Sequence, residues 1–111
     1  MPRDYKVYLE DILEAIRKIE QFTASFSSKA FAEDAKTFDA VIRNLEIIGE
    51  AVKNVPESVR AKHPQVEWKK IAGLRDMLIH EYFGVDADIV WDVVQNKLPP
   101  FKNQIAPLLQ A

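Results

Sequence analysis

Apolar residues recur three and four positions apart along most of this chain, which is the period of an amphipathic α-helix. The first segment with this pattern spans about residues 4–22, and its apolar positions are Tyr5, Tyr8, Leu9, Ile12, Leu13, Ile16 and Ile19. Charged residues fill the positions between them, so the segment is expected to bury one face. Residues 23–28 interrupt the pattern. Ser27 or Ser28 is expected to cap the next helix, because a hydroxyl there can accept a free backbone N–H.

A second, longer helix is predicted over residues 29–54. Its apolar stripe consists of Phe38, Val41, Ile42, Leu45, Ile48 and Val52. The opposite side carries a narrow band of polar residues, namely Asp39, Arg43, Glu46, Glu50 and Lys53. This polar band is either a solvated face with ion pairs along the helix or a polar wall that faces another helix. Gly49 costs the helix about 1 kcal/mol relative to alanine, which suggests that another helix passes close to it.

Three phenylalanines, Phe22, Phe26 and Phe31, gather around the turn between these two helices. Aromatic side chains in such a cluster are interpreted as parts of the core or of an interface, in preference to a ligand pocket.

Proline and glycine divide the second half of the chain. Pro56 stops the long helix, and residues 57–62 form at most two short turns. Helix resumes near Val66 or Glu67 and extends to about Phe83, where Gly84 can end it with a left-handed cap.

Asp86 is expected to cap a further helix that reaches about Lys97. Pro99 and Pro100 are expected to break it before a last helix, which Pro107 would kink or fray. The sequence therefore predicts one all-α domain over residues 1–111. Its expected architecture is an antiparallel bundle of four main helices with short extra ones.

Composition narrows the classes of function. The chain has 111 residues and a net charge of -2. It has no cysteine, which excludes disulfides, thiolate metal sites and cysteine nucleophiles. A protein that coats nucleic acid non-specifically would need a basic face, whereas an enzyme can hold RNA through a few placed cations. Because no stretch reads as a signal peptide or a membrane span, a cytoplasmic protein without membrane association is expected.

The candidate chemistry lies in residues 69–84, which contain Arg75, Asp76, His80 and Tyr82. Arginine offers a planar fork for phosphate oxygens, and histidine can exchange a proton near neutral pH. On a helical wheel Tyr82 lies about 20° from Arg75 and His80 about 140° from it. Asp76 precedes His80 by four residues, so its carboxylate can reach and orient the ring.

Arg75 has apolar neighbours on its face of the helix and therefore needs an acceptor, for which Glu46 or Glu50 would serve at rest. Two routes would bring Arg75 and His80 onto one phosphate. In the first route, the helix would unwind near His80. In the second, which we favour, two copies of the segment would face each other in a symmetric homodimer.

Other readings of these residues stay open. A lone histidine on a helix is more commonly structural than catalytic. His63 is expected at the surface, and no third ligand accompanies the two histidines, so no metal site is predicted. Lys69, Lys70 and Arg60 are either a path for RNA or ordinary solvated charges.

The pattern R-x-x-x-x-H-x-Y formed by Arg75, His80 and Tyr82 resembles the motif of HepT-like proteins, a branch of the HEPN ribonuclease superfamily. The similarity extends to the whole chain. Residues 8–13 (YLEDIL) resemble the opening helix of that family, 40–51 (AVIRNLEIIGEA) its long helix, and 71–75 (IAGLR) with 80–86 (HEYFGVD) its motif region.

The resemblance implies the toxin of a prokaryotic toxin–antitoxin pair, a homodimer that acts as a metal-independent endoribonuclease without a cofactor. Arg75 and His80 would be catalytic. The spacing and the polar band described above add Asp76, Glu46, Glu50 and Arg43 as supporting residues. The implied antitoxin is an MntA-like minimal nucleotidyltransferase, which would use ATP and magnesium to transfer AMP onto Tyr82. Two alternatives are a non-catalytic subunit that binds substrate or docks onto a nucleotidyltransferase, and a purely structural helical dimer.

Overall fold

The computed structural model describes residues 4–80 and 86–110, without the side chains of residues 78–80. Every regular element in this described part is helical, which confirms the predicted all-α class. The elements are α1 (Tyr5–Thr23), α2 (Ser28–Glu33), α3 (Ala35–Asn54), α4 (Glu57–Lys62), α5 (Trp68–His80), α6 (Ala87–Asp92), the π-helical segment η2 (Val93–Lys97), α7 (Leu98–Ile105) and the 3-10 turn η3 (Ala106–Leu109). The expected continuation of α5 to Phe83 and its cap at Gly84 lie outside the described residues.

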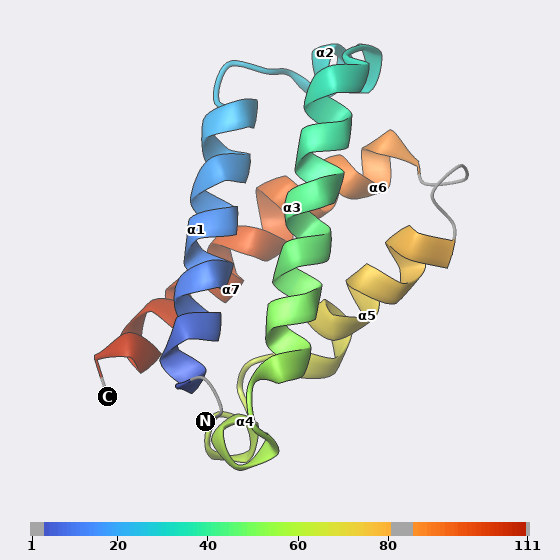
Figure 1. Ribbon diagram of the computed structural model, residues 1–111. Coiled ribbons are helices and arrows are strands. Elements are labelled where there is room, and N and C mark those ends of the chain that lie inside the picture. Colours follow the sequence, from blue (N-terminus) through green and yellow to red (C-terminus); the bar gives the residue numbers. More distant parts are fainter. Residues whose placement is uncertain (1–3, 81–85, 111) are drawn as a thin grey trace.

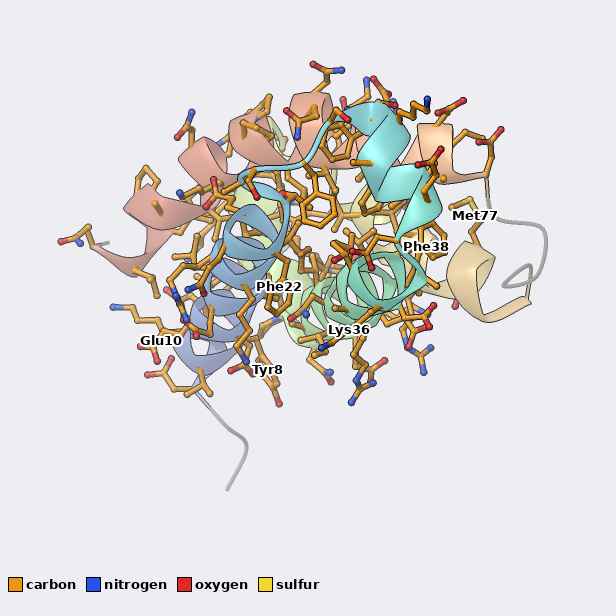
Figure 2. The ribbon with its side chains drawn as sticks, turned by 90° about the horizontal axis from the view of Figure 1, so that it is seen from above. Tyr8, Glu10, Phe22, Lys36, Phe38 and Met77 are labelled. Atoms are coloured by element: carbon orange, nitrogen blue, oxygen red, sulfur yellow. The ribbon has the colours of Figure 1, made fainter. Side chains whose placement is uncertain are left out.

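The helices α1, α3 and α5 lie side by side with alternating direction, and α4 forms a short turn at one end of α3 (Figure 1). The continuous helical path from α6 through α7 crosses obliquely behind α1 and α3, as the view from above also shows (Figure 2). The largest buried side chains fill the space between these elements: Phe31, Leu9, Ile12, Ile16, Ile19, Ile42, Leu45, Ile48, Leu98, Ile105 and Val41. The apolar stripes predicted for the first two helices thus form the core.

Helix starts follow the predicted capping chemistry. The Ser27 hydroxyl accepts a hydrogen bond from the Ala30 N–H at 3.1 Å and starts α2. The Asp86 carboxylate accepts one from the Asp88 N–H at 2.8 Å and starts α6. Each cap satisfies a backbone donor that the first helical turn leaves without a partner.

The prediction of one continuous helix over residues 29–54 is wrong, because the chain leaves helical geometry at Asp34. Asp34 has φ -108° and ψ 94°, and its carboxylate accepts a hydrogen bond from the Thr37 N–H at 3.1 Å. Its own N–H bonds to the carbonyl of Phe31 at the end of α2. The hydrogen bonds of Asp34 end one helix and start the next, although the spacing of apolar residues predicts a continuous helix. In the sequence this interruption is visible only as a single polar residue.

The predicted break at Pro99 and Pro100 is also wrong. Both prolines lie in the first turn of α7, where backbone N–H groups have no helical acceptor and their loss is tolerated. The preceding segment widens into a π-helix, in which the Leu98 N–H bonds to the carbonyl of Val93. This wider turn lets the helical path pass the two prolines without stopping. Pro107 falls in η3, where α7 has already ended.

The three phenylalanines have separate environments. Phe31 is fully buried, and its ring centroid lies 5.6 Å from that of Phe38 and 5.2 Å from that of Trp91. Phe26 packs against the core from a partly buried position, whereas Phe22 is 38% exposed and labelled at the surface in Figure 2. The interpretation as core holds for Phe31 and Phe26. Within the described part of the chain, no helix is both long and apolar enough to cross a bilayer.

Candidate functional site beside Arg75

α5 passes very close to α3 where Arg75 meets Gly49. A Cβ atom placed on Gly49 would lie 2.6 Å from the Cβ and 3.1 Å from the backbone nitrogen of Arg75. No real side chain would fit there, so the glycine makes the close packing of these two helices possible. This confirms the prediction that another helix passes Gly49, and it places the Arg75 side chain at the polar band of α3.

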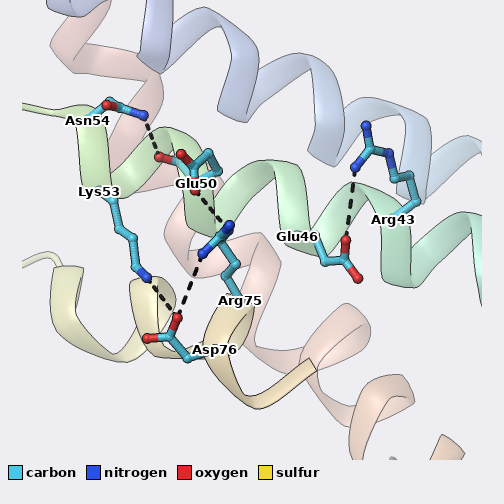
Figure 3. A network of polar contacts seen from close by, with 7 residues as sticks. All are labelled: Arg43, Glu46, Glu50, Lys53, Asn54, Arg75 and Asp76. Atoms are coloured by element: carbon cyan, nitrogen blue, oxygen red, sulfur yellow. Dashed lines mark hydrogen bonds and ion pairs between the residues drawn. The ribbon is translucent and has the colours of Figure 1, made fainter. Parts of the chain in front are cut away.

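Arg75 has Glu50 as its ion-pair partner. The Arg75 Nε lies 2.8 Å from Glu50 Oε2, and the arginine side chain is 34% exposed (Figure 3). Glu46, the other predicted acceptor, instead faces Arg43, whose Nη1 lies 3.9 Å away. The prediction of a half-buried arginine with a carboxylate on the long helix is confirmed, and the structure selects Glu50.

Asp76 extends this contact to a second cation of α3. Its Oδ1 accepts a hydrogen bond from the Lys53 Nζ at 2.7 Å and lies 3.8 Å from the Arg75 Nη1 (Figure 3). The sequence placed Lys53 in the polar band but gave no signal that separated it from other surface lysines. The predicted pairing of Asp76 with His80 involves a side chain outside the described residues.

Both readings of the polar band therefore hold, for different parts of it. Glu50 and Lys53 face α5 and form a polar wall with Arg75 and Asp76. Arg43, further up α3, is 73% exposed and belongs to the solvated part. Glu50 and Lys53 both follow Gly49, the residue at which Arg75 of α5 meets α3, whereas Arg43 precedes it by six positions.

A hollow of about 310 Å³ lies next to Arg75 on the polar face of α3. Its lining consists of Tyr8 and Asp11 from α1, Arg43, Glu46, Ile47, Glu50, Ala51 and Asn54 from α3, and Arg75 from α5. The hollow thus contains four of the predicted site residues. Tyr8 and Asp11 were not predicted to belong to the site, because only the packing of α1 against α3 brings them there.

A larger hollow of about 440 Å³ lies between the start of α5 and the segment formed by η2 and α7. Arg75, the predicted catalytic residue whose side chain the structure describes, does not line it. Lys70, one of the three cations considered as a path for RNA, lines this hollow and pairs with Glu67 at 3.1 Å. Arg60 lies on α4, where its Nε is buried without a hydrogen-bond partner among the described residues. These two cations do not join the Arg75 site.

The remaining motif residues are less fully described. His80 is the last residue of α5, and its side chain is outside the described set. Tyr82 lies outside the described residues altogether, so its predicted place on the face of Arg75 stays a prediction. In the part of the chain that the structure describes, no three His, Cys, Asp or Glu residues are grouped so that they could hold a metal ion.

Comparison with known proteins places the chain in a family. The sequence profile of the family described as "Ribonuclease HepT-like" matches residues 12–108, which is most of the chain. This chain belongs to the HepT-like ribonuclease family. No solved structure matches it significantly.

Relatives of this HepT-like chain cover nearly all of its length. "Putative RNase MJ0127" of Methanocaldococcus jannaschii is 49% identical over 99% of this chain and 92% of its own length. "Probable ribonuclease HepT" of Thermococcus cleftensis is 48% identical over 97% of this chain and 98% of its own length. "Putative RNase TTE0752" of Caldanaerobacter subterraneus subsp. tengcongensis is 45% identical over 93% of this chain and 92% of its own length. The resemblance first seen around Arg75 thus extends over the whole HepT-like sequence.

Proposed function

We propose that this HepT-like protein is a metal-independent endoribonuclease and the toxin of a toxin–antitoxin pair. Membership of the HepT-like ribonuclease family supports the choice of RNA as substrate. The observation that carries the proposal on the structural side is the placement of Arg75. Its guanidinium is held through Nε by Glu50, stays partly exposed, and borders a hollow on the polar face of α3.

The proposed reaction needs no metal ion. The 2′-OH of a ribose attacks the adjacent phosphorus, the P–O5′ bond breaks, and a 2′,3′-cyclic phosphate and a 5′-OH result. One His80 removes the proton from the 2′-OH, and the leaving 5′-oxygen takes its proton from water. Such proton transfer contributes about 10²–10⁴-fold. Arg75 stabilises the charge that develops on the phosphorane oxygens.

Replacement of the histidines tests the reaction. The His80→Ala variant is expected to lose RNA cleavage by at least about 10²-fold and to lose toxicity in growing cells, while its circular dichroism and unfolding midpoint stay close to those of the parent. His63→Ala is the matched control, because His63 follows α4 and contributes hydrogen bonds through its backbone: its N–H donates to the Arg60 carbonyl, and its carbonyl accepts from the Val66 N–H and the Trp68 Nε1. Cleavage by purified His80→Ala at the parental rate would refute the assignment.

We further propose that the active form is a symmetric homodimer in which Arg75 of one protomer serves His80 of its partner. The helical-wheel separation of about 140° between the two residues supports this arrangement. A mixture of Arg75→Ala and His80→Ala protomers tests it. If the residues act across the dimer, each mixed dimer keeps one intact site, and equal mixing restores roughly a quarter of the parental activity. If they act within one chain, no mixed dimer has an intact site, and activity is not restored.

The proposed antitoxin is an MntA-like nucleotidyltransferase that attaches AMP to Tyr82. The added phosphate would place a negative charge where it competes with the substrate phosphate for Arg75. Incubation with the antitoxin, ATP and magnesium should increase the intact mass by whole AMP units and abolish cleavage, and Tyr82→Phe should stay unmodified. An AMP group on another residue would contradict this assignment. Tight binding of the nucleotidyltransferase by a protein without RNase activity would favour the non-catalytic subunit.

A further inference from the structure

Two cations from different helices converge on one carboxylate oxygen beside the candidate site. Lys53 Nζ of α3 lies 2.7 Å from Asp76 Oδ1, and Arg75 Nη1 of α5 lies 3.8 Å from the same atom (Figure 3). The lysine reaches this oxygen from across the helix interface, whereas the arginine is the neighbour of the aspartate in sequence. The oxygen therefore marks a point in space at which an anionic oxygen is held by both cations.

The exposure of these groups makes that point accessible to a ligand. The Lys53 side chain is 36% exposed, that of Arg75 34% and that of Asp76 56%. A lysine–carboxylate pair with this exposure contributes little to stability, because water screens it. The aspartate is the most exposed of the three groups, so a ligand oxygen can approach the two cations from its side.

Charge balance indicates what would replace it. Glu50, Lys53, Arg75 and Asp76 together carry no net charge at neutral pH. When the Asp76 carboxylate moves away, Lys53, Arg75 and Glu50 retain a single positive charge, which matches the single negative charge of one phosphodiester. Glu50 engages the arginine through Nε, so the other edge of the guanidinium stays directed toward the shared oxygen.

We propose that Lys53 is a second phosphate-binding residue of the site, and that Asp76 Oδ1 occupies at rest the place that an RNA phosphate oxygen takes in the complex. The inference rests on the proposed ribonuclease function and adds to it a residue outside the R-x-x-x-x-H-x-Y motif. Lys53 binds the phosphate as a mobile point charge, and Arg75 binds it with a planar fork. Asp76 competes with the substrate for both cations.

The test measures binding of a single-stranded RNA oligonucleotide to the His80→Ala protein, which does not consume it, over a series of salt concentrations. Adding Lys53→Gln is expected to weaken binding roughly tenfold, because one charged contact to a phosphate oxygen is lost. The slope of log affinity against log salt should fall by about one contact. Lys53→Arg should retain most of the affinity.

Lys102→Gln is the matched control. The Lys102 Nζ pairs with Glu20 Oε1 at 2.9 Å, with side chains 43% and 47% exposed, so an equivalent pair is removed on a different face of the bundle. This variant should keep both the affinity and the salt slope of the His80→Ala parent. If Lys53→Gln behaves like Lys102→Gln, Lys53 makes no phosphate contact and the inference is overturned.

Asp76 variants separate phosphate binding from a structural role of the ion pair. If Asp76 competes with RNA, Asp76→Asn should tighten RNA binding, and the double variant Lys53→Gln/Asp76→Asn should still lack the Lys53 contact. If the pair only holds α3 against α5, both single variants weaken binding alike and the double variant shows no further change. That second pattern overturns the inference.

Failure of the inference can be told apart from failure of the proposed function. If the unsubstituted protein cleaves RNA but Lys53→Gln leaves RNA binding unchanged, the ribonuclease function stands and only the Lys53 contact is refuted. If Lys53→Gln reduces the salt slope of RNA binding but the unsubstituted protein never cleaves RNA, the phosphate contact stands and the ribonuclease reaction is refuted. If the unsubstituted protein neither binds nor cleaves RNA, both are refuted.

Discussion

Gly49 of α3 and Arg75 of α5 approach so closely that a Cβ atom on the glycine would lie 2.6 Å from the Cβ of the arginine. The packing of the two helices and the position of the candidate phosphate-binding group are therefore set at the same point. A change in the helix contact displaces the guanidinium, and Glu50, one residue after the glycine, then no longer meets the Arg75 Nε at 2.8 Å.

Gly49→Ala is expected to destabilise the protein by about 1–3 kcal/mol through overpacking, partly offset by the higher helix propensity of alanine. It should also lower RNA cleavage, because α5 must move away from α3 and Arg75 moves with it. Urea unfolding and a cleavage assay measure the two effects. Gly73→Ala is the control: among the described residues nothing lies within 4 Å of a Cβ at Gly73, so this change should stabilise α5 by about 0.5–1 kcal/mol. Equal effects of the two substitutions would contradict the role of the close approach.

Glu50→Ala is expected to reduce kcat/KM for RNA by about 10–100-fold while the free energy of unfolding changes by less than about 1 kcal/mol. The carboxylate positions the guanidinium, and Glu50→Gln, which retains an acceptor oxygen, should lose less. Glu14→Ala removes a comparable carboxylate, 51% exposed and 2.7 Å from Arg17, on the surface of α1. An activity loss in Glu14→Ala as large as that in Glu50→Ala would show that the effect is not local to Arg75.

Asp34→Ala is expected to lower the free energy of unfolding by about 1 kcal/mol, within the 0.5–2 kcal/mol usual for a helix cap. The Thr37 N–H loses its acceptor at the start of α3, a helix that supplies much of the core. Ser27→Ala removes the cap of the six-residue helix α2 and should cost less. Chemical denaturation of both variants measures the difference, and a larger loss for Ser27→Ala would contradict this account.

Trp68→Phe is expected to destabilise the protein by about 1–3 kcal/mol, because the indole loses its partly buried hydrogen bond to the His63 carbonyl and the ring becomes smaller. The Trp68 Nε1 donates to that carbonyl at 3.0 Å, and the side chain is only 6% exposed. Trp91→Phe, at a partly buried site beside Phe31, should cost less. Thermal unfolding of the two variants provides the comparison, and RNA cleavage at a permissive temperature should be retained in both.

Much of the fold could be predicted from local pattern. The segment around Leu9 and Ile16 and the one around Leu45 and Ile48 become buried helices because a 3.6-residue period places these side chains on one face. The caps at Ser27 and Asp86 follow from hydroxyl and carboxylate chemistry within three residues. The two errors, at Asp34 and at Pro99 with Pro100, concern geometry that competes with the helical period: a cap inside a continuous pattern, and a π-turn that accommodates two prolines.

The sequence by itself determined the helical period, the caps, the family motif around Arg75 and the need for a carboxylate near that arginine, because each depends on residues a few positions apart or on the chemistry of one side chain. Only the tertiary structure decided between Glu46 and Glu50, brought Tyr8 and Asp11 to the hollow, and joined Lys53 to Asp76 over 23 positions. These choices depend on the rotation and depth at which α5 packs on α3. That packing is set at the contact of Gly49 with Arg75. The glycine in the sequence indicated that some helix passes close to it, but not which residue of that helix would meet it.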